Sequence, residues 1–294
     1  MIPFRHKFRA MASVAEIQLY AQDLSSATRA ARAAQHEVER IESKYSRYRD
    51  DSVTTAINRG GGDAVAIDPE TSALLDYAHA CWEQSDGLFD ITSGVLRRAW
   101  DFKRAVPPTQ SDICPLLERI GWPRVRRGTG SVALELGMEI DFGGIGKEYA
   151  ADRAAAVLLE CGITSALVNL GGDIRAIGSH PGSKPWQIGI VDPRAAERSI
   201  ARVPVVNTAL ATSGDYQRCI VHDGRRYCHV LNPKTGWPVE GPQSVSVIAP
   251  LCVVAGSGAT IAMLKCDGAR AYLDDQQLPY LLIDRDGHVS GTLG

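Results

Sequence analysis

The 294-residue sequence has no run of 18 consecutive apolar residues, and the basic residues at its start are not followed by the apolar core of a signal peptide. A membrane-spanning helix needs about 20 apolar residues, so the sequence predicts no membrane span. It favours a cytoplasmic protein, or a periplasmic one if a leader has been removed. The charge shows no excess either: 32 basic and 34 acidic residues leave a net −2, which gives no general attraction to nucleic acid.

The cysteines form no recognisable set. There are seven, an odd number, and no two have Cys-x-x-Cys spacing, so the sequence indicates neither a disulfide framework nor a zinc site. Internal repeats, low-complexity tracts and Pro/Gly/Ser-rich linkers are also absent. With 45% hydrophobic residues the chain can form a substantial core, and we expect residues 1–294 to make a single domain.

Hydrophobic periodicity predicts strands and helices that are mixed without strict βαβ alternation, which favours an α+β fold over a doubly wound sheet. The expected strands are 11–20, two short strands within 132–140, 165–178 with a break at 171–173, 186–193, 203–211, 244–249 and a closing pair within 279–290. The expected helices are 27–45, capped by Ser25 or Ser26, a short one ending at Asn58, and 69–85, 147–159 and 253–265.

The segment 141–147, Asp-Phe-Gly-Gly-Ile-Gly-Lys, is predicted to link a strand ending before Asp141 to the helix 147–159. Adjacent glycines let a ligand approach the backbone closely, and a helix start offers free N–H groups to an anion. Lys147 adds a positive charge. A tight structural turn with a solvated lysine would have the same sequence.

Three other loops, at 171–173, 212–218 and 234–236, also combine glycines or hydroxyls with a nearby Lys, Arg or Asp. These residue types hold phosphates through backbone N–H groups, hydroxyls and metal. Any one loop could be structural. All four together favour a nucleotide or another phosphoanhydride as the ligand.

The sequence resembles the ApbE family, the FAD:protein FMN transferases. The resemblance covers nearly the whole chain and rests on six motifs in family order, at 46–52 with Asn58, 87–90, 141–147, 168–173, 211–216 and 229–236. It implies a tunnelling-fold-like core of two similar halves, with mixed or antiparallel sheets flanked by helices. It also implies FAD as substrate, Mg²⁺, and transfer of FMN to a threonine or serine hydroxyl of an acceptor flavoprotein with release of AMP.

Placed on this chain, the resemblance makes His229 the candidate general base, because an imidazole titrates near neutral pH. Asp215 is the second catalytic candidate. The candidate FAD-binding residues are Met11, Tyr48, Phe89, Asp90, Lys147, Gly171, Gly172, Asp173, Thr212, Ser213, Gly214, Tyr216, Thr235 and Gly236. For Asp215 and Asp173, structural turn-capping is an equal alternative, and the aromatic residues and Met11 could simply be core.

The chain departs from the family pattern at the expected metal site, for which the candidates are Gly146, Gly256 and Thr260. Gly256 stands where the family usually has the metal-binding aspartate, Glu148 where a glycine usually follows the lysine, and Cys228 where a histidine often precedes His229. A hard cation loses much of its attraction without a carboxylate. Two alternatives therefore stand beside a transferase: an FAD-binding carrier or regulatory protein with an impaired metal site, and an FAD pyrophosphatase in which water replaces the acceptor.

Overall fold

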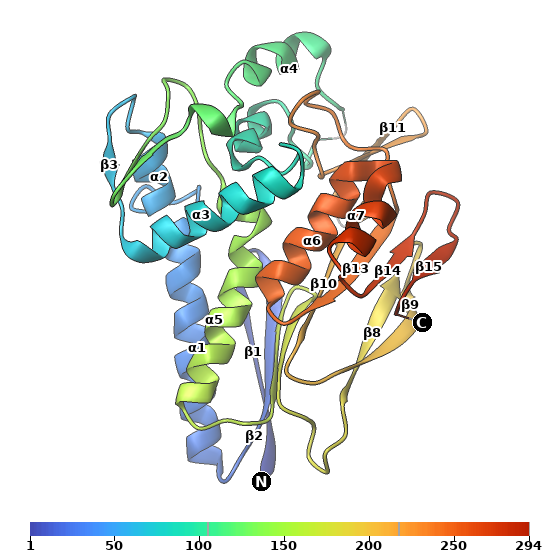
Figure 1. Ribbon diagram of the computed structural model, residues 1–294. Coiled ribbons are helices and arrows are strands. Elements are labelled where there is room, and N and C mark those ends of the chain that lie inside the picture. Colours follow the sequence, from blue (N-terminus) through green and yellow to red (C-terminus); the bar gives the residue numbers. More distant parts are fainter. Residues whose placement is uncertain (105, 217, 294) are drawn as a thin grey trace.

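An eight-stranded antiparallel sheet organises the computed structural model, which describes residues 1–104, 106–216 and 218–293 (Figure 1). Its strands, in spatial order, are β1 (Ile2–Ala10), β2 (Ser13–Ala21), β6 (Ala166–Leu170), β7 (Asp173–Ile177), β10 (Ala209–Gly214), β13 (Ser244–Ala249), β14 (Tyr280–Ile283) and β15 (Val289–Gly291). The α+β fold with antiparallel sheets is thus confirmed. The strand at 244–249 and the closing pair are also where the sequence predicts them.

The first strand, β1, was not predicted, because residues 2–9 read as a merely basic segment. In the structure β1 pairs with β2 along its whole length. Phe4 and Phe8 are half-buried while Arg5, Lys7 and Arg9 face solvent. Charged residues on an exposed edge strand discourage pairing with other chains, and here they concealed the alternating pattern.

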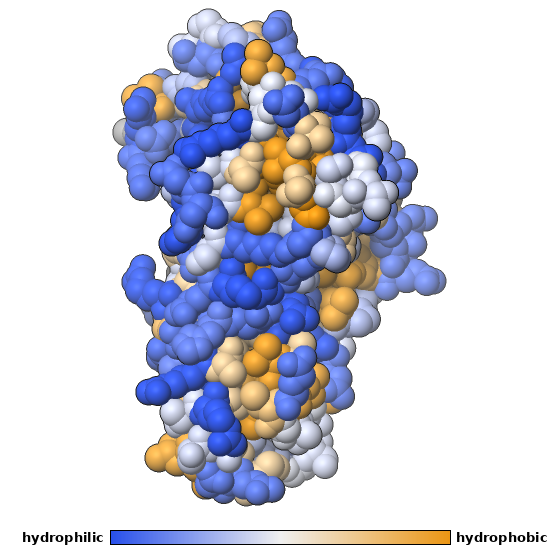
Figure 2. Space-filling view, turned by 90° about the vertical axis from the view of Figure 1, so that its left-hand side faces the viewer, coloured by the Kyte–Doolittle hydropathy of each residue, from blue (hydrophilic) through white to orange (hydrophobic). Residues whose placement is uncertain are grey.

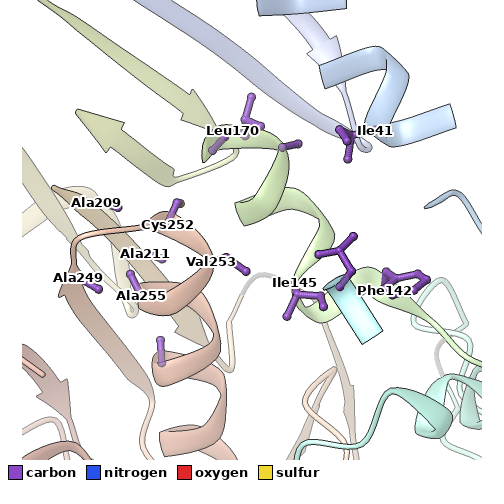
Figure 3. Close-up of a cluster of buried hydrophobic side chains, with 14 of the residues drawn as sticks. Ile41, Phe142, Ile145, Leu170, Ala209, Ala211, Ala249, Cys252, Val253 and Ala255 are labelled. Carbon is purple, nitrogen blue, oxygen red and sulfur yellow. The ribbon is translucent and has the colours of Figure 1, made fainter. Parts of the chain in front are cut away.

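Three helices, α1 (Leu24–Tyr45), α5 (Gly146–Glu160) and α6 (Cys252–Lys265), cover one face of the sheet (Figure 1). Their contact surfaces are rich in small residues, which let backbones approach closely, and Figure 3 shows Cys252, Val253 and Ala255 at the start of α6 beside alanines of β10 and β13. The predicted cap of α1 is wrong by two or three positions. Asp23 is the N-cap, accepting a hydrogen bond from the Ser26 backbone at 2.8 Å.

The hairpin of β8 (Trp186–Asp192) and β9 (Ala195–Val205) packs on the opposite face of the sheet through its own apolar cluster. The predicted strand 203–211 is wrong, because its two ends belong to β9 and β10. Asn207, with a φ of 53°, makes the turn between them. The predicted strand 165–178 is likewise a hairpin, which reverses at Gly171 and Gly172.

The remaining elements lie beyond the start of α5 and along α6 (Figure 1). They are α2 (Val53–Asn58), β3 (Val65–Ala66), α3 (Pro69–Gln84), η1 (Ile91–Arg98), α4 (Gln110–Leu117), η2 (Trp122–Arg124), β4 (Arg126–Gly128), β5 (Ser131–Ala133), η3 (Phe142–Gly144), β11 (Cys219–His222), β12 (Arg225–Cys228), η4 (Cys266–Gly268) and α7 (Ala269–Asp275).

Only β5 forms in the region 132–140, so neither a second strand there nor the strand expected before Asp141 is present. The side chain of Asn58 takes the place of a strand partner. Its amide nitrogen donates to the Ile140 carbonyl at 3.0 Å, and its amide oxygen accepts from the Ile140 N–H at 2.7 Å. One side chain thereby satisfies the backbone that leads into α5.

The side of the molecule toward the left of Figure 1 is mostly hydrophilic, and Figure 2 shows two larger apolar areas on it besides scattered single apolar residues. Across residues 1–104, 106–216 and 218–293, none of the helices combines the length and apolar character needed to cross a bilayer.

The N-terminus of α6 is capped from outside its own sequence. Asp152 of α5 accepts hydrogen bonds from the backbone of Cys252 at 2.8 Å and Val253 at 2.9 Å, and Arg175 of β7 pairs with the same carboxylate at 3.3 Å. Helix α6 has no local side-chain cap. This long-range contact therefore ties α5, α6 and β7 together beneath the candidate site.

Asp152→Ala should lower the free energy of unfolding by about 2–3 kcal/mol, because it removes two charge-assisted hydrogen bonds from a largely buried helix start. Urea denaturation followed by circular dichroism measures this. Asp23→Ala is the matched control, since its cap of α1 is exposed and its loss should lower the free energy of unfolding by clearly less. Equal losses in the two variants would contradict the structural role given to Asp152.

Candidate functional site

Helix α5 begins at a cluster of close backbone contacts. Asp141 caps the turn η3 by accepting from the Gly143 N–H at 2.9 Å, and its carboxylate is ion-paired to Arg47. A Cβ atom on Gly144 would lie only 3.1 Å from the ring of Phe89. Gly144 is therefore needed for packing, and this part of the motif is explained without a ligand.

Lys147 in the first turn of α5 forms an ion pair with Asp173, at the start of β7, with 2.6 Å between Nζ and Oδ2. Asp173 is buried, and the backbone of Thr212 in β10 is near enough to lower the pKa of its carboxyl group. Burial raises the pKa of Asp173 and the charge of Lys147 opposes that rise. Three of the sequence-predicted residues, from three separate motifs, thus meet at one point.

Glu148, the next residue of α5, is buried against the same cluster. Burial raises the pKa of Glu148, and the neighbouring negative charge of Asp173 raises it further. Among the described residues, Oε2 of Glu148 has no hydrogen-bond partner. The sequence marked Glu148 as a departure from the family pattern, and the structure adds that its carboxylate oxygen is buried without a donor.

The glycine hairpin after β6 borders this cluster. A Cβ on Gly171 would lie 2.7 Å from Ser13 Oγ and 3.9 Å from Lys147 Cδ, whereas one on Gly172 would meet nothing within 4 Å. Met11, in the β1–β2 turn next to Ser13, donates its backbone N–H to Glu42 at 2.8 Å. The hairpin thus presents an open glycine backbone next to the positive charge of Lys147.

Hydroxyl groups line the neighbouring strands and helix. Ser213 of β10 and Thr260 of α6 are 2.8 Å apart through their side-chain oxygens, and Thr212 makes the same kind of contact with Ser246 of β13. Gly256 lies one helical turn before Thr260, and residues four apart share a helix face. The predicted residues Ser213, Gly256 and Thr260 are therefore grouped beside Glu148, whereas the side chain of Thr212 points to the opposite face of the sheet, the side of Leu210 and Ile248.

The residues expected to hold magnesium can be compared with this arrangement. Thr260 offers a hydroxyl, Gly146 begins α5 two residues before Glu148, and Glu148 supplies a buried carboxylate oxygen without a donor. Gly256 supplies space and no ligand side chain. Hard oxygen donors of this kind fit a divalent cation.

His229 follows β12, and its backbone N–H donates to the Arg218 carbonyl at 3.0 Å. The ring is solvent-accessible, yet the surrounding protein still desolvates it. This desolvation, reinforced by the positive charges of Arg218 and Lys147, lowers the pKa of His229 below its usual 6.5. The imidazole is consequently neutral at pH 7, the state in which it can accept a proton.

Asp215 forms a two-pronged ion pair with Arg194 of the β8–β9 turn, with both N–O distances 2.8 Å. Its neighbour Gly214 packs so tightly on the Tyr216 ring that a Cβ there could not be accommodated. Gln217, which belongs to the predicted loop 212–218, lies outside the described residues. Asp215 is near Cys228, the residue before His229, where its charge raises the thiol pKa after the larger effect of burial.

Several predicted ligand-binding residues make structural contacts instead. Asp90 caps η1 by accepting from Thr92, and its other oxygen accepts from the Trp122 N–H at 3.0 Å. The Gly236 carbonyl accepts from Trp100 Nε1 at 2.7 Å, and Thr235 is the exposed residue before it in the same turn. These contacts give Asp90 and Gly236 structural roles within their motifs.

Tyr48, one of the predicted FAD-binding residues, is highly exposed, with 82% of its surface accessible. Arg47 lies over its ring at 4.9 Å and donates to its hydroxyl at 2.8 Å. Arg47 is also the partner of Asp141, so it joins Tyr48 to the start of α5. The sequence analysis assigned no role to Arg47, although this residue lies within the motif 46–52.

Two surface hollows lie apart from this cluster. One of about 410 Å³ is lined by residues of β4 and β5, and one of about 580 Å³ by residues of β2, β6 and β8. Neither includes Lys147, Asp173 or His229 in its lining. The buried carboxyl groups and the glycine backbone, and not these hollows, identify the candidate site.

Comparisons with known proteins agree with the motifs. The model of the ApbE family matches residues 11–282. An FAD:protein FMN transferase of Treponema pallidum is 34% identical over 233 residues, which span 72% of this chain and 64% of that protein. One of Rhodobacter capsulatus is 32% identical over 68% of this chain and 39% of its own length.

Solved structures give the same result for the fold. The crystal structure of the ApbE protein of Thermotoga maritima has a TM-score of 0.91 and 31% identity, and the match covers 99% of this chain and 97% of that one. The flavin transferase ApbE of Vibrio cholerae, 24% identical with a TM-score of 0.87, has the same fold, again with 99% of this chain and 97% of that one covered.

Proposed function

Since this chain belongs to the ApbE family, we propose that it transfers FMN from FAD to a threonine or serine hydroxyl of an acceptor flavoprotein, releasing AMP. The observation that carries the proposal is the meeting of Lys147, Asp173 and the open Gly171–Gly172 hairpin at one point. Backbone N–H groups and a lysine are suited to a pyrophosphate. We further propose that residues 1–294 act as one domain, and the cytoplasmic location stays a prediction.

In the proposed reaction, the acceptor hydroxyl oxygen attacks the FMN-side phosphorus of FAD. The new P–O bond forms as the bond to the AMP phosphate breaks, and AMP leaves with that electron pair. Neutral His229 takes the hydroxyl proton. Lys147 and the Gly171–Gly172 backbone hold the pyrophosphate oxygens, while Thr212, Ser213, Gly214 and Tyr216 are proposed to contact the rest of FAD.

Magnesium is proposed as the cofactor, held by Glu148, Thr260 and the backbone near Gly146. When bound, it would neutralise charge on the pyrophosphate. Met11, Tyr48 and Phe89 are proposed to border the flavin or adenine ring, and Asp215 to position the β10 loop near His229. Asp90, Thr235 and Gly236 are proposed to act indirectly, by holding the motifs that face the ligand.

The carrier alternative depends on an impaired metal site at Gly256. The buried carboxylate of Glu148 beside Gly256 weakens that argument, because negative charge is still present there. The pyrophosphatase alternative needs the same site with water as the nucleophile. An acceptor protein distinguishes it from a transferase.

FAD should bind more tightly than FMN, and riboflavin most weakly, because the adenosine and second phosphate add contacts with the glycine hairpin and Lys147. Titration of flavin fluorescence gives the three affinities. Asp112→Asn, in the exposed capping box of α4, is a control that should leave the order unchanged. Equal affinities for riboflavin and FAD would contradict the assignment of the hairpin to a pyrophosphate.

The transfer rate should fall about tenfold per pH unit below the pKa of His229 and be level above it, because only the neutral imidazole accepts a proton. Arg218 helps to lower that pKa. In Arg218→Gln the acidic limb should therefore move to higher pH. Single-turnover rates between pH 5 and about 8 measure the shift. An acidic limb at the same pH in both proteins would mean that Arg218 does not lower the pKa of His229.

A further inference from the structure

The side chain of Glu148 fills the space that a side chain at position 256 would need. A Cβ atom on Gly256 would lie 2.5 Å from Glu148 Cγ and 2.9 Å from its Oε1, distances that no real side chain accepts. The carboxyl group of Glu148 can stand against α6 only because residue 256 has no side chain. The two residues, from α5 and α6, are therefore sterically coupled.

Burying the carboxylate of Glu148 costs free energy unless another group compensates its negative charge. It is 8% exposed, and its Oε2 has no hydrogen-bond partner among the described residues. Asp173 brings a second buried carboxyl group, whereas Lys147 brings one positive charge. Two carboxylates and one ammonium leave a net negative charge in a desolvated site, which a cation or a proton must balance.

The surrounding donors suit a cation. Thr260 lies one turn after Gly256 on the same helix face, and its hydroxyl contacts Ser213 at 2.8 Å. Carboxylate and hydroxyl oxygens are the ligands of hard divalent ions. A buried carboxylate oxygen without a donor, next to the helix face that carries Thr260, is a feature expected of a metal ligand.

We propose that Glu148 of α5 supplies the metal-binding carboxylate that α6 lacks at position 256. The carboxylate and the glycine have thus exchanged places between positions 148 and 256. The site binds Mg²⁺ or Mn²⁺ through Glu148 and Thr260, with Asp173 held in the ion pair with Lys147. The inference rests on the proposed function for its biological meaning. Metal binding itself can be measured without any transfer reaction.

The test uses the full chain and Mn²⁺, whose free fraction is read by electron paramagnetic resonance, first alone and then with FAD. Glu148→Gln keeps the shape of the side chain and should weaken Mn²⁺ binding about 10- to 100-fold. Gly256→Asp alone should also lose binding and stability, because its side chain collides with Glu148. The double variant Glu148→Gly with Gly256→Asp should restore affinity to within a few-fold of the starting protein.

Glu139→Gln is the matched control. Glu139 is a buried carboxylate too, but it is ion-paired to Arg97 and Arg98, so its loss should leave Mn²⁺ affinity unchanged. Mn²⁺ affinity that is equal in the starting protein and Glu148→Gln, or no binding in either, would overturn the inference and mean that Glu148 holds only a proton. FAD titration separates the two claims. If FAD binds but the Mn²⁺ affinity does not depend on Glu148, the inference is wrong and the proposed function stands. If Mn²⁺ binding depends on Glu148 but FAD does not bind, the proposed function is wrong and the inference stands.

Discussion

Replacing His229 with alanine should lower the single-turnover rate of FMN transfer by about 10²- to 10⁴-fold while leaving FAD affinity nearly intact. The reason is that His229 is neutral at pH 7, because desolvation and the charges of Arg218 and Lys147 lower its pKa. A neutral imidazole can accept the proton of the attacking hydroxyl. Rates at saturating FAD, with the acceptor in excess, measure the effect.

His222→Ala is the control for this experiment. His222 lies in the neighbouring strand β11, has a half-buried ring beside Asp223, and is given no role in the reaction. The control should transfer FMN at the unchanged rate. A His229→Ala protein as fast as the His222 control would reduce His229 to a turn residue.

Lys147→Met should lower the free energy of unfolding at pH 7.5 by about 3–5 kcal/mol, because it leaves buried carboxyl groups without their positive partner. Lys265→Met is the matched control. Its partner Asp86 is 82% exposed, and water screens the charge of such a partner, so the loss should be much smaller. Urea denaturation of both variants gives the comparison.

The loss in Lys147→Met should depend on pH. Burial already raises the pKa of Glu148 above its ordinary 4.5, and removing the lysine charge raises it further. An acid whose pKa is higher in the folded state stabilises the fold below its unfolded pKa and loses that contribution as pH rises through the folded pKa. The deficit should therefore be smallest near pH 4.5 and largest near pH 8; a deficit that does not change with pH would contradict the buried carboxyl pair.

The sequence predicted most of the sheet and helix framework because that framework has strong periodicity. The pattern in β2 is an example, with Ala15, Ile17 and Leu19 buried and their neighbours outward. It failed where long-range contacts replace local signals. Asn58 holds Ile140 as a strand would, and Asp152 caps α6 from another helix.

The candidate site likewise contains residues that local sequence patterns predicted and residues whose roles depend on long-range contacts. Glycine and lysine motifs identified Lys147, Asp173 and the 171–172 hairpin, and the structure brings these residues together. Asp90 and Gly236 belong to equally strong motifs, but their polar groups are engaged by the fold. No local pattern could reveal that Glu148 fills the space left by Gly256, because the two residues meet only when α5 packs on α6.

Intact-mass analysis of an acceptor protein incubated with the pure protein, FAD and Mg²⁺, with AMP assayed in the same reaction, tests the proposed transfer most directly. The account predicts an acceptor heavier by one FMN group per modified hydroxyl and one AMP released for each. An unmodified acceptor would contradict the proposed transfer. AMP and free FMN released together would then indicate hydrolysis of FAD, whereas FAD that stays bound and intact would indicate a carrier.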